Sequence, residues 1–214
     1  MFAIFWGMSI IIVDYGAGNL TSVYNALTYL NIKSKISCEP MEIENAGKII
    51  FPGVGAAKNS METLNRTGIG EAIKNSVKKG TPVLGICIGC QIILESSEED
   101  GGVQCLGLLK GSAVKFKTEP NLKIPHIGWN QVHFTKEHPI FKDIPDNSNF
   151  YFVHSYYPGL GKESSLTYGT STYGSQTFPC IIGKDNLIAT QFHLEKSGEI
   201  GLKVLGNFAH PAHF

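Results

Sequence analysis

Short apolar runs alternate with longer amphipathic segments through the first half of the chain. Four runs are predicted as strands: residues 10–13, which are apolar enough to be buried, and residues 33–38, 48–51 and 82–86. Three intervening segments repeat their apolar residues with the period of a helix: residues 20–30, 57–64 and 69–79. Strands and helices that alternate in this way form a parallel sheet covered by helices.

The pattern changes after about residue 100, where Gly, Pro, Thr and aromatic residues become more frequent. Four short runs there are typical of antiparallel strands: residues 114–117, 131–134, 150–154 and 181–182. A strand at 187–193 and a helix at 198–208 complete the predicted elements. Because no repeat or low-complexity linker divides the chain, we predict one α/β domain over residues 1–214, with a mostly parallel central sheet flanked by helices and an added antiparallel, strand-rich part.

Size, charge and cysteine content narrow the function classes. The 214 residues, 43% of them hydrophobic, are enough to bury one substantial core. The 18 basic and 18 acidic side chains cancel without forming blocks, so binding to nucleic acid or to an anionic membrane is not indicated. Five scattered cysteines, an odd number, favour a reducing compartment over a disulfide-stapled secreted domain. We therefore expect a cytoplasmic protein whose partner is a small molecule or another protein.

The N-terminal 13 residues are apolar but carry no Lys or Arg, and they are too short to span a bilayer. An uncleaved signal peptide needs a basic flank that this segment lacks. We therefore expect a buried strand at 10–13 preceded by a loose extension over residues 1–8, within which Met8 is a candidate start.

A cysteine stands between two glycines where a predicted strand meets a predicted helix. The segment 85–89 reads Gly-Ile-Cys-Ile-Gly, and a helix-like segment follows at 90–95. Such a turn forces its central residue into a strained conformation, and the glycines let strand and helix pass closely. The free N–H groups at a helix start favour the thiolate, so Cys87 is a candidate nucleophile. A glycine-flanked core cysteine is the structural alternative.

A His-x-Glu pair near the C-terminus offers the partners that a thiolate nucleophile needs. The nucleophile requires a proton acceptor, and that base requires a third group to orient it. On an extended strand His193 and Glu195 would point to the same face, so the carboxylate can lie beside the imidazole. Such a pair alone is commonly a solvated strand end. Together with the elbow, it predicts a triad of Cys87, His193 and Glu195.

Two further features converge on the sulfur. Gln91 and Glu95 follow Cys87 by four and eight residues, so a helix would place them on the face of the cysteine, where they can orient a substrate. Gln91 would otherwise be a solvated helix residue. The loop 53–55, Gly-Val-Gly, follows a neighbouring predicted strand and can turn N–H groups toward an oxyanion, although this pattern also forms ordinary turns.

Cys87 and Cys90 also form a Cys-x-x-Cys pair, which raises a rival from another enzyme class, a thioredoxin-like dithiol oxidoreductase. Redox pairs do not require the flanking glycines and give no role to a distant His-x-Glu. A structural zinc site would need a second cysteine pair, which the sequence lacks. We expect neither a metal nor a cofactor.

Six motifs together resemble the class I, or triad, glutamine amidotransferases. They are Asp-Tyr-Gly-Ala-Gly-Asn at 14–19, Pro-Gly-Val-Gly at 52–55, the elbow with its following residues at 85–91, Pro-His-Ile-Gly-Trp-Asn at 125–130, Tyr-Phe-Val-His-Ser-Tyr at 151–156 and Gln-Phe-His-Leu-Glu-Lys-Ser at 191–197. The first motif and the fourth, which we expect to form a loop, narrow the resemblance to the glutaminase subunits of imidazole glycerol phosphate synthases. The resemblance runs from about residue 10 to the closing helix and implies a flavodoxin-like fold.

The resemblance implies a role for each matching residue. Cys87 would attack the side-chain amide carbon of glutamine, and His193, oriented by Glu195, would protonate the departing ammonia. Water would then hydrolyse the glutamyl thioester to glutamate. Three backbone N–H groups would hold the oxyanion, those of Gly53, Val54 and Ile88. The positions that hold glutamine are matched by Gly55, Gln91, Glu95, His154, Ser155 and Tyr156.

The resemblance also implies a protein partner, because ammonia is mostly protonated and unreactive at neutral pH and such glutaminases deliver it through a tunnel. In the histidine pathway the partner is a (β/α)8 barrel cyclase subunit, which forms a heterodimer with the glutaminase and makes imidazole glycerol phosphate and an aminoimidazole carboxamide nucleotide. The implied docking face comprises Asn19, His126, Gly128, Trp129 and Asn130. An exposed Trp is a typical interface anchor, although Trp129 would equally suit partial core burial.

Two positions depart from the resembled pattern. Cys90 stands where the family usually has Met, and Leu194 stands where it usually has Pro. Neither change removes a reacting atom. They leave two alternatives open: a paralogue that supplies ammonia to an amidating synthase in surface-sugar biosynthesis, and a non-catalytic subunit that keeps the fold without turnover.

Overall fold

This computed structural model describes residues 9–210 of the chain. A nine-stranded sheet forms the centre of the fold. Five neighbouring strands pair in parallel: β2 (Ser34–Ser37), β1 (Ile10–Val13), β3 (Lys48–Gly53), β4 (Val83–Cys87) and β13 (Leu187–Thr190). Four antiparallel strands extend the sheet: β12 (Gln176–Lys184), β11 (Thr167–Tyr173), β8 (His126–Phe134) and β9 (Ser148–His154). The expected extension over residues 1–8 lies outside the described residues.

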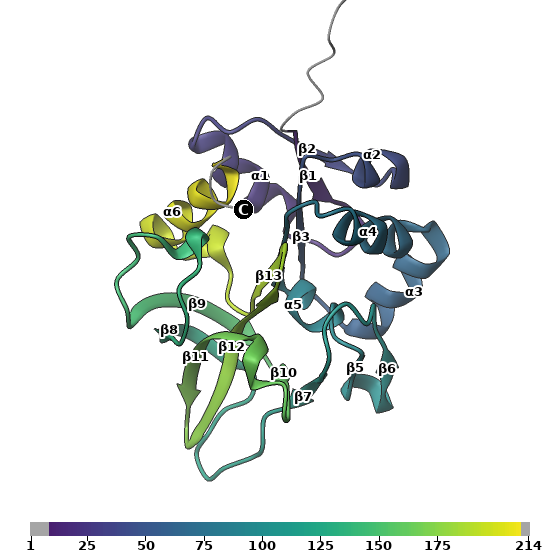
Figure 1. The fold of residues 1–214 in the computed structure, drawn as a ribbon. Coiled ribbons are helices and arrows are strands. Elements are labelled where there is room, and N and C mark those ends of the chain that lie inside the picture. The colour runs from purple at the N-terminus through teal and green to yellow at the C-terminus, as the bar shows by residue number, and fades with distance from the viewer. Residues whose placement is uncertain (1–8, 211–214) are drawn as a thin grey trace, which may run out of the picture.

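Helices cover both faces of the parallel strands, as Figure 1 shows with this part of the sheet nearly edge-on. One face carries α1 (Leu20–Tyr29) and α6 (Gly198–Ala209). The other carries α2 (Pro40–Glu44), α3 (Ala57–Thr67) and α4 (Ile69–Lys78). None of the helices in residues 9–210 has the length and apolar composition needed to cross a membrane.

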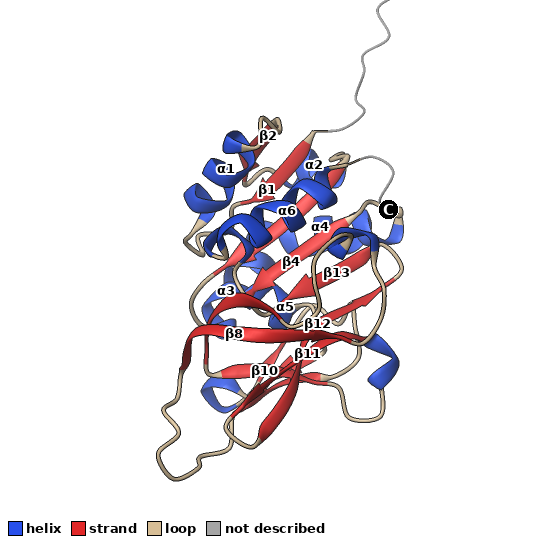
Figure 2. Cartoon of the chain, turned by 90° about the vertical axis from the view of Figure 1, so that its left-hand side faces the viewer, coloured by secondary structure: helices blue, strands red, loops and turns tan. Residues whose placement is uncertain are grey.

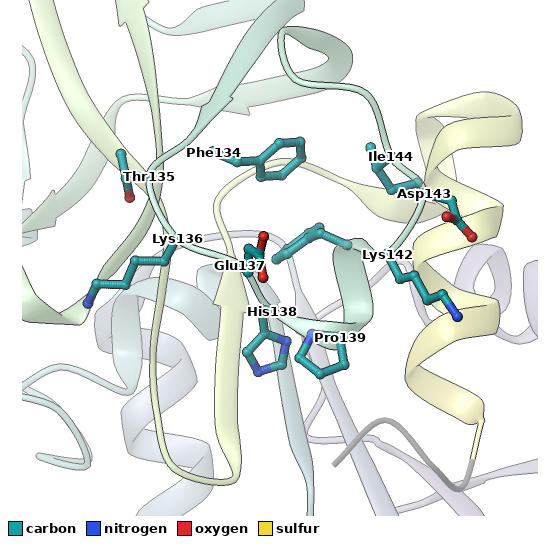
Figure 3. A pocket seen from close by; sticks show the side chains of 10 residues that line it. Phe134, Thr135, Lys136, Glu137, His138, Pro139, Lys142, Asp143 and Ile144 are labelled. Carbon is teal, nitrogen blue, oxygen red and sulfur yellow. The ribbon is translucent and has the colours of Figure 1, made fainter.

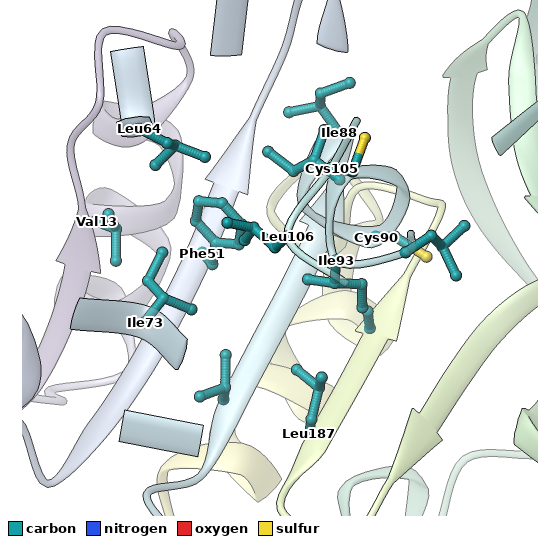
Figure 4. Close-up of a cluster of buried hydrophobic side chains, with 14 of the residues drawn as sticks. Val13, Phe51, Leu64, Ile73, Ile88, Cys90, Ile93, Cys105, Leu106 and Leu187 are labelled. Atoms are coloured by element: carbon teal, nitrogen blue, oxygen red, sulfur yellow. The ribbon is translucent and has the colours of Figure 1, made fainter. Parts of the chain in front are cut away.

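The alternation of side chains along β1 explains why its whole sequence is apolar. Ile10 and Ile12 pack with the residues of α1 and α6, whereas Ile11 and Val13 pack in the cluster on the opposite face. Successive strand residues point to opposite faces, so a strand covered on both sides buries every side chain. Figure 4 shows the cluster that contains Ile11 and Val13, in which Val13 lies near Phe51 of β3.

A smaller sheet lies beside the carboxyl ends of the parallel strands. Its order is β10 (Tyr156–Gly159), β7 (Ser112–Lys115), β5 (Ser96–Ser97) and β6 (Val103–Gln104). Figure 2 shows the antiparallel strands gathered at one end of the molecule, below the helix-covered part. Short helices complete the fold: α5 (Ile88–Ile92), η1 (Glu99–Gly101), η2 (Pro139–Phe141), η3 (Ser164–Leu166) and η4 (Leu194–Lys196).

The α/β class, the helix-flanked parallel strands and the antiparallel extension are confirmed, although parallel and antiparallel pairings are equally frequent in the large sheet. Three local predictions are wrong. The helix expected at 90–95 is α5 over Ile88–Ile92, and the strand expected through residue 193 ends at Thr190. The motif at 125–130, expected as a loop, forms the start of β8, because His126 through Val132 pair with β9.

Candidate active site

Cys87 ends β4 and caps α5 in a strained conformation, with φ 54° and ψ −106°. A non-glycine residue keeps such a conformation only where surrounding packing enforces it. A Cβ atom added to Gly89 would lie 2.1 Å from the backbone oxygen of Phe51, so α5 approaches β3 as closely as only glycine permits. The elbow thereby fixes the Cys87 sulfur at the carboxyl end of the parallel strands.

His193 and Glu195 form a buried pair. The imidazole Nδ1 lies 2.7 Å from Glu195 Oε1, and the side chains are 1% and 0% exposed. Because Nδ1 faces a carboxylate, it carries the proton, and Nε2 is the nitrogen that faces other chemistry. Within the described residues Nε2 is buried with no hydrogen-bond partner. The pair forms through the η4 turn and not on an extended strand, so the predicted contact is present while its expected backbone geometry is wrong.

The Cys87 sulfur raises the pKa of the His193 imidazole. Burial by itself would lower the pKa of His193, but the nearby Cys87 sulfur and the Glu195 carboxylate outweigh it and raise that pKa to about 10. A protonated imidazole next to a sulfur stabilises the thiolate. The three predicted triad residues are therefore brought together in an arrangement suited to nucleophilic attack followed by proton donation.

Asn19 contacts the triad directly. Its Nδ2 donates a hydrogen bond to Glu195 Oε1, the same oxygen that faces His193. Asn19 has a φ of 76° and ends the turn at 14–19, in which the Gly16 N–H bonds to Asp14 Oδ1 at 3.0 Å. The sequence suggested only a docking role for Asn19. Its contact with the carboxylate was missed because it joins segments 176 positions apart in the chain.

The candidate oxyanion loop lies against the elbow. Gly53 is paired in register with Cys87, and a Cβ at Gly53 would lie 2.0 Å from the Tyr15 hydroxyl and 2.4 Å from Ile88 Cγ2. Any larger residue at position 53 would force the Tyr15 or the Ile88 side chain to move. The structure thus places Gly53, Val54 and Ile88 around the nucleophile, while the role of their N–H groups stays a prediction.

A pocket of about 370 Å³ opens over Cys87. Most of the predicted site residues line it: Val54, Gly55, Cys87, Ile88, Gln91, His154, Ser155 and Tyr156. Glu99, Pro125, Val153 and Lys196 also line it and were not predicted as site residues. Lys196 directly follows the triad carboxylate in sequence, so its position carried a usable signal. Glu99 had none, because it reaches the site through the η1 turn.

Glu95 lies outside this pocket, and the helical argument for it is wrong. The helix ends at Ile92, because the carbonyls of Ile92, Ile93 and Leu94 accept hydrogen bonds from backbone N–H groups of residues 106–109 in place of helical ones. Glu95 is exposed and accepts the Gly111 N–H at 3.1 Å. A glutamine-binding role for Glu95 has no support in this geometry.

The predicted docking residues separate into exposed and buried members. Trp129 is 57% exposed on the outer side of β8, next to Ile127, which is 59% exposed and was not among the predicted docking residues. His126, by contrast, is only 2% exposed, because alternation along the strand turns it inward. Its side chain therefore does not contribute directly to an outer surface, contrary to the expectation. Asn130 is half-buried and donates to the Thr172 carbonyl at 2.8 Å.

Cys90 and Leu194, the two departures from the family pattern, are both fully buried and line no part of the pocket. They lie in different apolar clusters, Cys90 on the opposite side from Cys87. Burial raises the pKa of the Cys90 thiol well above its ordinary value, and the neighbouring Cys180 adds to the rise. An inert thiol directed into another cluster is unsuited to the dithiol chemistry considered above.

A larger cavity of about 910 Å³ lies under the segment 134–144, shown in Figure 3. None of the predicted site residues lines it. Size alone is a poor guide to chemistry here, because the strained nucleophile and the buried ion pair are in the smaller pocket. Among residues 9–210, no three His, Cys, Asp or Glu side chains gather as a metal site would require.

Comparisons with known proteins show the family of the chain. Residues 11–211 match the family "Glutamine amidotransferase class-I". The imidazole glycerol phosphate synthase subunit HisH of Chlorobaculum tepidum is 44% identical over 200 residues, covering 94% of this chain and 98% of that protein. The subunit of the same name from Acinetobacter baylyi is 46% identical over 200 residues, covering 93% and 96%.

Solved structures show the same fold at lower identity. The structure of PurLQS from Thermotoga maritima aligns with a TM-score of 0.74 at 16% identity, covering 94% of this chain and 97% of that one. A glutamine amidotransferase from Thermotoga maritima aligns with a TM-score of 0.65 at 16% identity, covering 94% and 82%. The elbow, the buried pair and these similarities lead to one conclusion: the chain belongs to the class-I glutamine amidotransferase family, enzymes that take ammonia from glutamine.

Proposed function

We propose that this chain is the glutaminase subunit of an imidazole glycerol phosphate synthase and supplies ammonia for histidine biosynthesis. The observation that carries the proposal is the buried His193 and Glu195 pair, 2.7 Å apart, beside a cysteine held on a strained elbow. The assignment to this synthase draws on relatives of that name that are 44% and 46% identical and match nearly their whole length.

In the proposed reaction the Cys87 sulfur attacks the side-chain carbonyl carbon of glutamine. The C–N bond breaks as protonated His193 gives its proton to the leaving nitrogen, so ammonia departs and a glutamyl thioester remains. Neutral His193 then removes a proton from water, whose oxygen attacks the thioester carbon. The C–S bond breaks, glutamate leaves, and the thiolate and protonated imidazole are restored.

The fixed groups around the sulfur have defined tasks in this cycle. Glu195 keeps the Nδ1 proton of His193 in place, and Asn19 donates a hydrogen bond to the same carboxylate oxygen. The N–H groups of Gly53, Val54 and Ile88 are the candidates for stabilising the negative carbonyl oxygen in each tetrahedral intermediate. Because Glu195 and Asn19 already hold His193 in this orientation, little reorganisation of the imidazole is needed at the moment of reaction.

The proposed partner is a (β/α)8 barrel cyclase subunit, and the proposed compartment is the cytoplasm. Exposed Ile127 and Trp129 suit an interface, because large apolar side chains rarely stay in solvent together without a partner. The Trp129 ring packs edge-on against the Tyr151 ring, with 6.0 Å between the ring centroids. The backbone carbonyl of Tyr151 in turn accepts a hydrogen bond from the backbone N–H of His193 at 2.9 Å. A partner seated on Trp129 would therefore lie within two side chains of the triad.

The test combines the chain with a purified cyclase subunit from a relative such as Chlorobaculum tepidum. We expect glutamine to drive formation of imidazole glycerol phosphate, and Cys87→Ala to abolish it. The matched control replaces glutamine with an ammonium salt at alkaline pH, where the Cys87→Ala complex should still form product. Glutamate release that survives Cys87→Ala would refute the mechanism. Glutamine hydrolysis without any coupling to a cyclase would refute the partner assignment alone.

A further inference from the structure

The Gln191 side chain lies next to the Cys87 sulfur, and the mechanism described so far gives it no role. It follows β13, is fully buried, and its Nε2 lies 3.8 Å from the Cys87 sulfur. Its backbone is fixed by the hydrogen bond from its N–H to the Cys180 carbonyl at 2.8 Å. Gln191 does not line the glutamine pocket, so a substrate-binding role does not account for this contact.

A second carboxamide determines which end of Gln191 faces the sulfur. Gln91 Nε2 lies 2.9 Å from the Tyr156 carbonyl and must be the donor there, because a carbonyl only accepts. The same Nε2 lies 3.1 Å from Gln191 Oε1. If Gln191 were flipped, two NH₂ groups would face each other and its oxygen would face the sulfur. The amide of Gln191 is therefore held with its N–H groups toward Cys87.

Two buried histidines, His154 and His126, extend the hydrogen-bond network that holds the two carboxamides in this orientation. The Tyr156 carbonyl also accepts from His154 Nδ1 at 2.8 Å, and His126 Nδ1 lies 3.0 Å from His154 Nε2. Burial lowers the pKa of His154 to about 3 and that of His126 to about 4, so both rings are neutral near pH 7. Each ring then donates once and accepts once. Asn130 Nδ2, 3.3 Å from His126 Nε2, supplies the last donor.

The contacts of the sulfur itself separate two protonation states. As a thiol, Cys87 has the Val153 carbonyl as acceptor at 4.0 Å. As a thiolate it can only accept, and Gln191 is the neutral donor directed at it. Hydrogen bonds to a charged acceptor are roughly twice as strong as neutral ones. The carboxamide therefore favours the charged sulfur over the thiol.

We propose that Gln191 is a catalytic residue whose carboxamide donates a hydrogen bond to the Cys87 sulfur whenever that sulfur carries negative charge. This occurs in the resting thiolate and again when the C–S bond of the thioester breaks and its electron pair returns to sulfur. Gln91, His154 and His126 are positioning residues that hold the amide in the donating orientation. The inference rests on Cys87 being the nucleophile, as proposed above.

The test measures the rate of Cys87 alkylation by iodoacetamide between pH 5 and pH 10, without glutamine or a partner. Cys38→Ser serves as the background, because Cys38 is the exposed cysteine among the five. In Gln191→Leu we expect the alkylation profile to move to higher pH by about one unit, with roughly tenfold slower alkylation near pH 6, the loss of one hydrogen bond to a charged group. The isosteric Gln191→Glu should move it further above pH 7, because it places a carboxylate beside the sulfur.

Thr190→Val is the matched control, since Thr190 is equally buried one residue away but its hydroxyl donates to the Phe192 carbonyl at 3.0 Å. It should leave the profile unchanged. With a cyclase partner, Gln191→Leu should lower kcat about tenfold and leave KM for glutamine unchanged, the same lost bond. An unshifted profile in a folded Gln191→Leu or, if that variant fails to fold, in Gln191→Glu would overturn the inference. If Cys87 shows no enhanced alkylation even in the parent protein, the proposed function fails as well.

Discussion

Replacing Gly89 by Ala should break the elbow, although the same change normally stabilises a helix. Gly89 lies inside α5, and Ala is favoured over Gly by about 1 kcal/mol in a helix interior. Here the added Cβ would lie 2.1 Å from the Phe51 carbonyl oxygen and 3.2 Å from its carbon. Backbone atoms of a central strand cannot rotate away, so α5 would have to move by more than an ångström.

Forcing extra atoms into a packed core typically costs about 1–3 kcal/mol, and a backbone collision belongs at the upper end. After subtracting the gain in helix propensity, we expect Gly89→Ala to lose about 2 kcal/mol of unfolding free energy. For a chain of this size that lowers Tm by roughly 4–8 °C. The displaced helix carries the Cys87 backbone with it, so glutaminase activity should fall much more than the loss of stability explains.

Gly206→Ala provides the matched control, because Gly206 also lies inside a helix, α6, and a Cβ there meets no atom within 4 Å. It should raise the unfolding free energy by about 0.5–1 kcal/mol, the normal propensity gain. Urea unfolding followed by circular dichroism measures both variants. A Gly89→Ala protein as stable as the parent, with normal activity, would show that close packing does not hold the nucleophile.

Three further predictions concern the network, the carboxylate and the surface. Below pH 6.5 the histidines of the unfolded chain bind protons, whereas buried His126 and His154 stay neutral in the folded protein. The unfolding free energy should therefore be highest above pH 6.5 and fall by a few kcal/mol toward pH 3. Equal unfolding free energies from urea titrations at pH 7, 5 and 4 would contradict this. Asn19→Ala should lower kcat about tenfold without changing Tm by more than a few degrees, since it removes one charge-assisted hydrogen bond to Glu195; full activity with the partner bound would argue against that role. Trp129→Ala should weaken cyclase binding by about 2 kcal/mol, roughly 30-fold, in calorimetric titration while Cys87 alkylation stays normal; unchanged affinity would move the interface elsewhere.

Local patterns predicted the parallel half of the fold well. The apolar run at β1 and the helical period of α4 appear within one residue of their expected bounds, because burial on both sides or on one face writes a clear periodicity into sequence. The five-residue helix α2 was missed, since a single turn leaves too few positions for a period. The N-terminal end of β8 resembles a loop in sequence, because Gly128 and the preceding Pro125 are residues typical of loops and conceal the strand pairing.

The site was predictable where covalent spacing decides geometry and not where long-range contacts do. Cys87, His193 and Glu195 lie in two short motifs, a Gly-x-Cys-x-Gly turn and a His-x-Glu pair, whose spacing is enough to predict their roles. Glu95 was misplaced, because the end of α5 is set by hydrogen bonds from residues 106–109, which no local pattern records. Gln191 belongs to the motif at 191–197, but the sequence assigned it no role, since its contact with Cys87 spans 104 positions of sequence.

The proposed mechanism requires that Cys87 form a covalent glutamyl intermediate with help from His193. The most direct measurement is acid quenching of the chain, mixed with its cyclase partner and isotopically labelled glutamine, followed by peptide mass spectrometry. The predicted result is a labelled glutamyl group on the peptide that contains Cys87, lost in Cys87→Ala and accumulating in no other peptide. Release of labelled glutamate with no label on Cys87, or with label on a different residue, would contradict this mechanism.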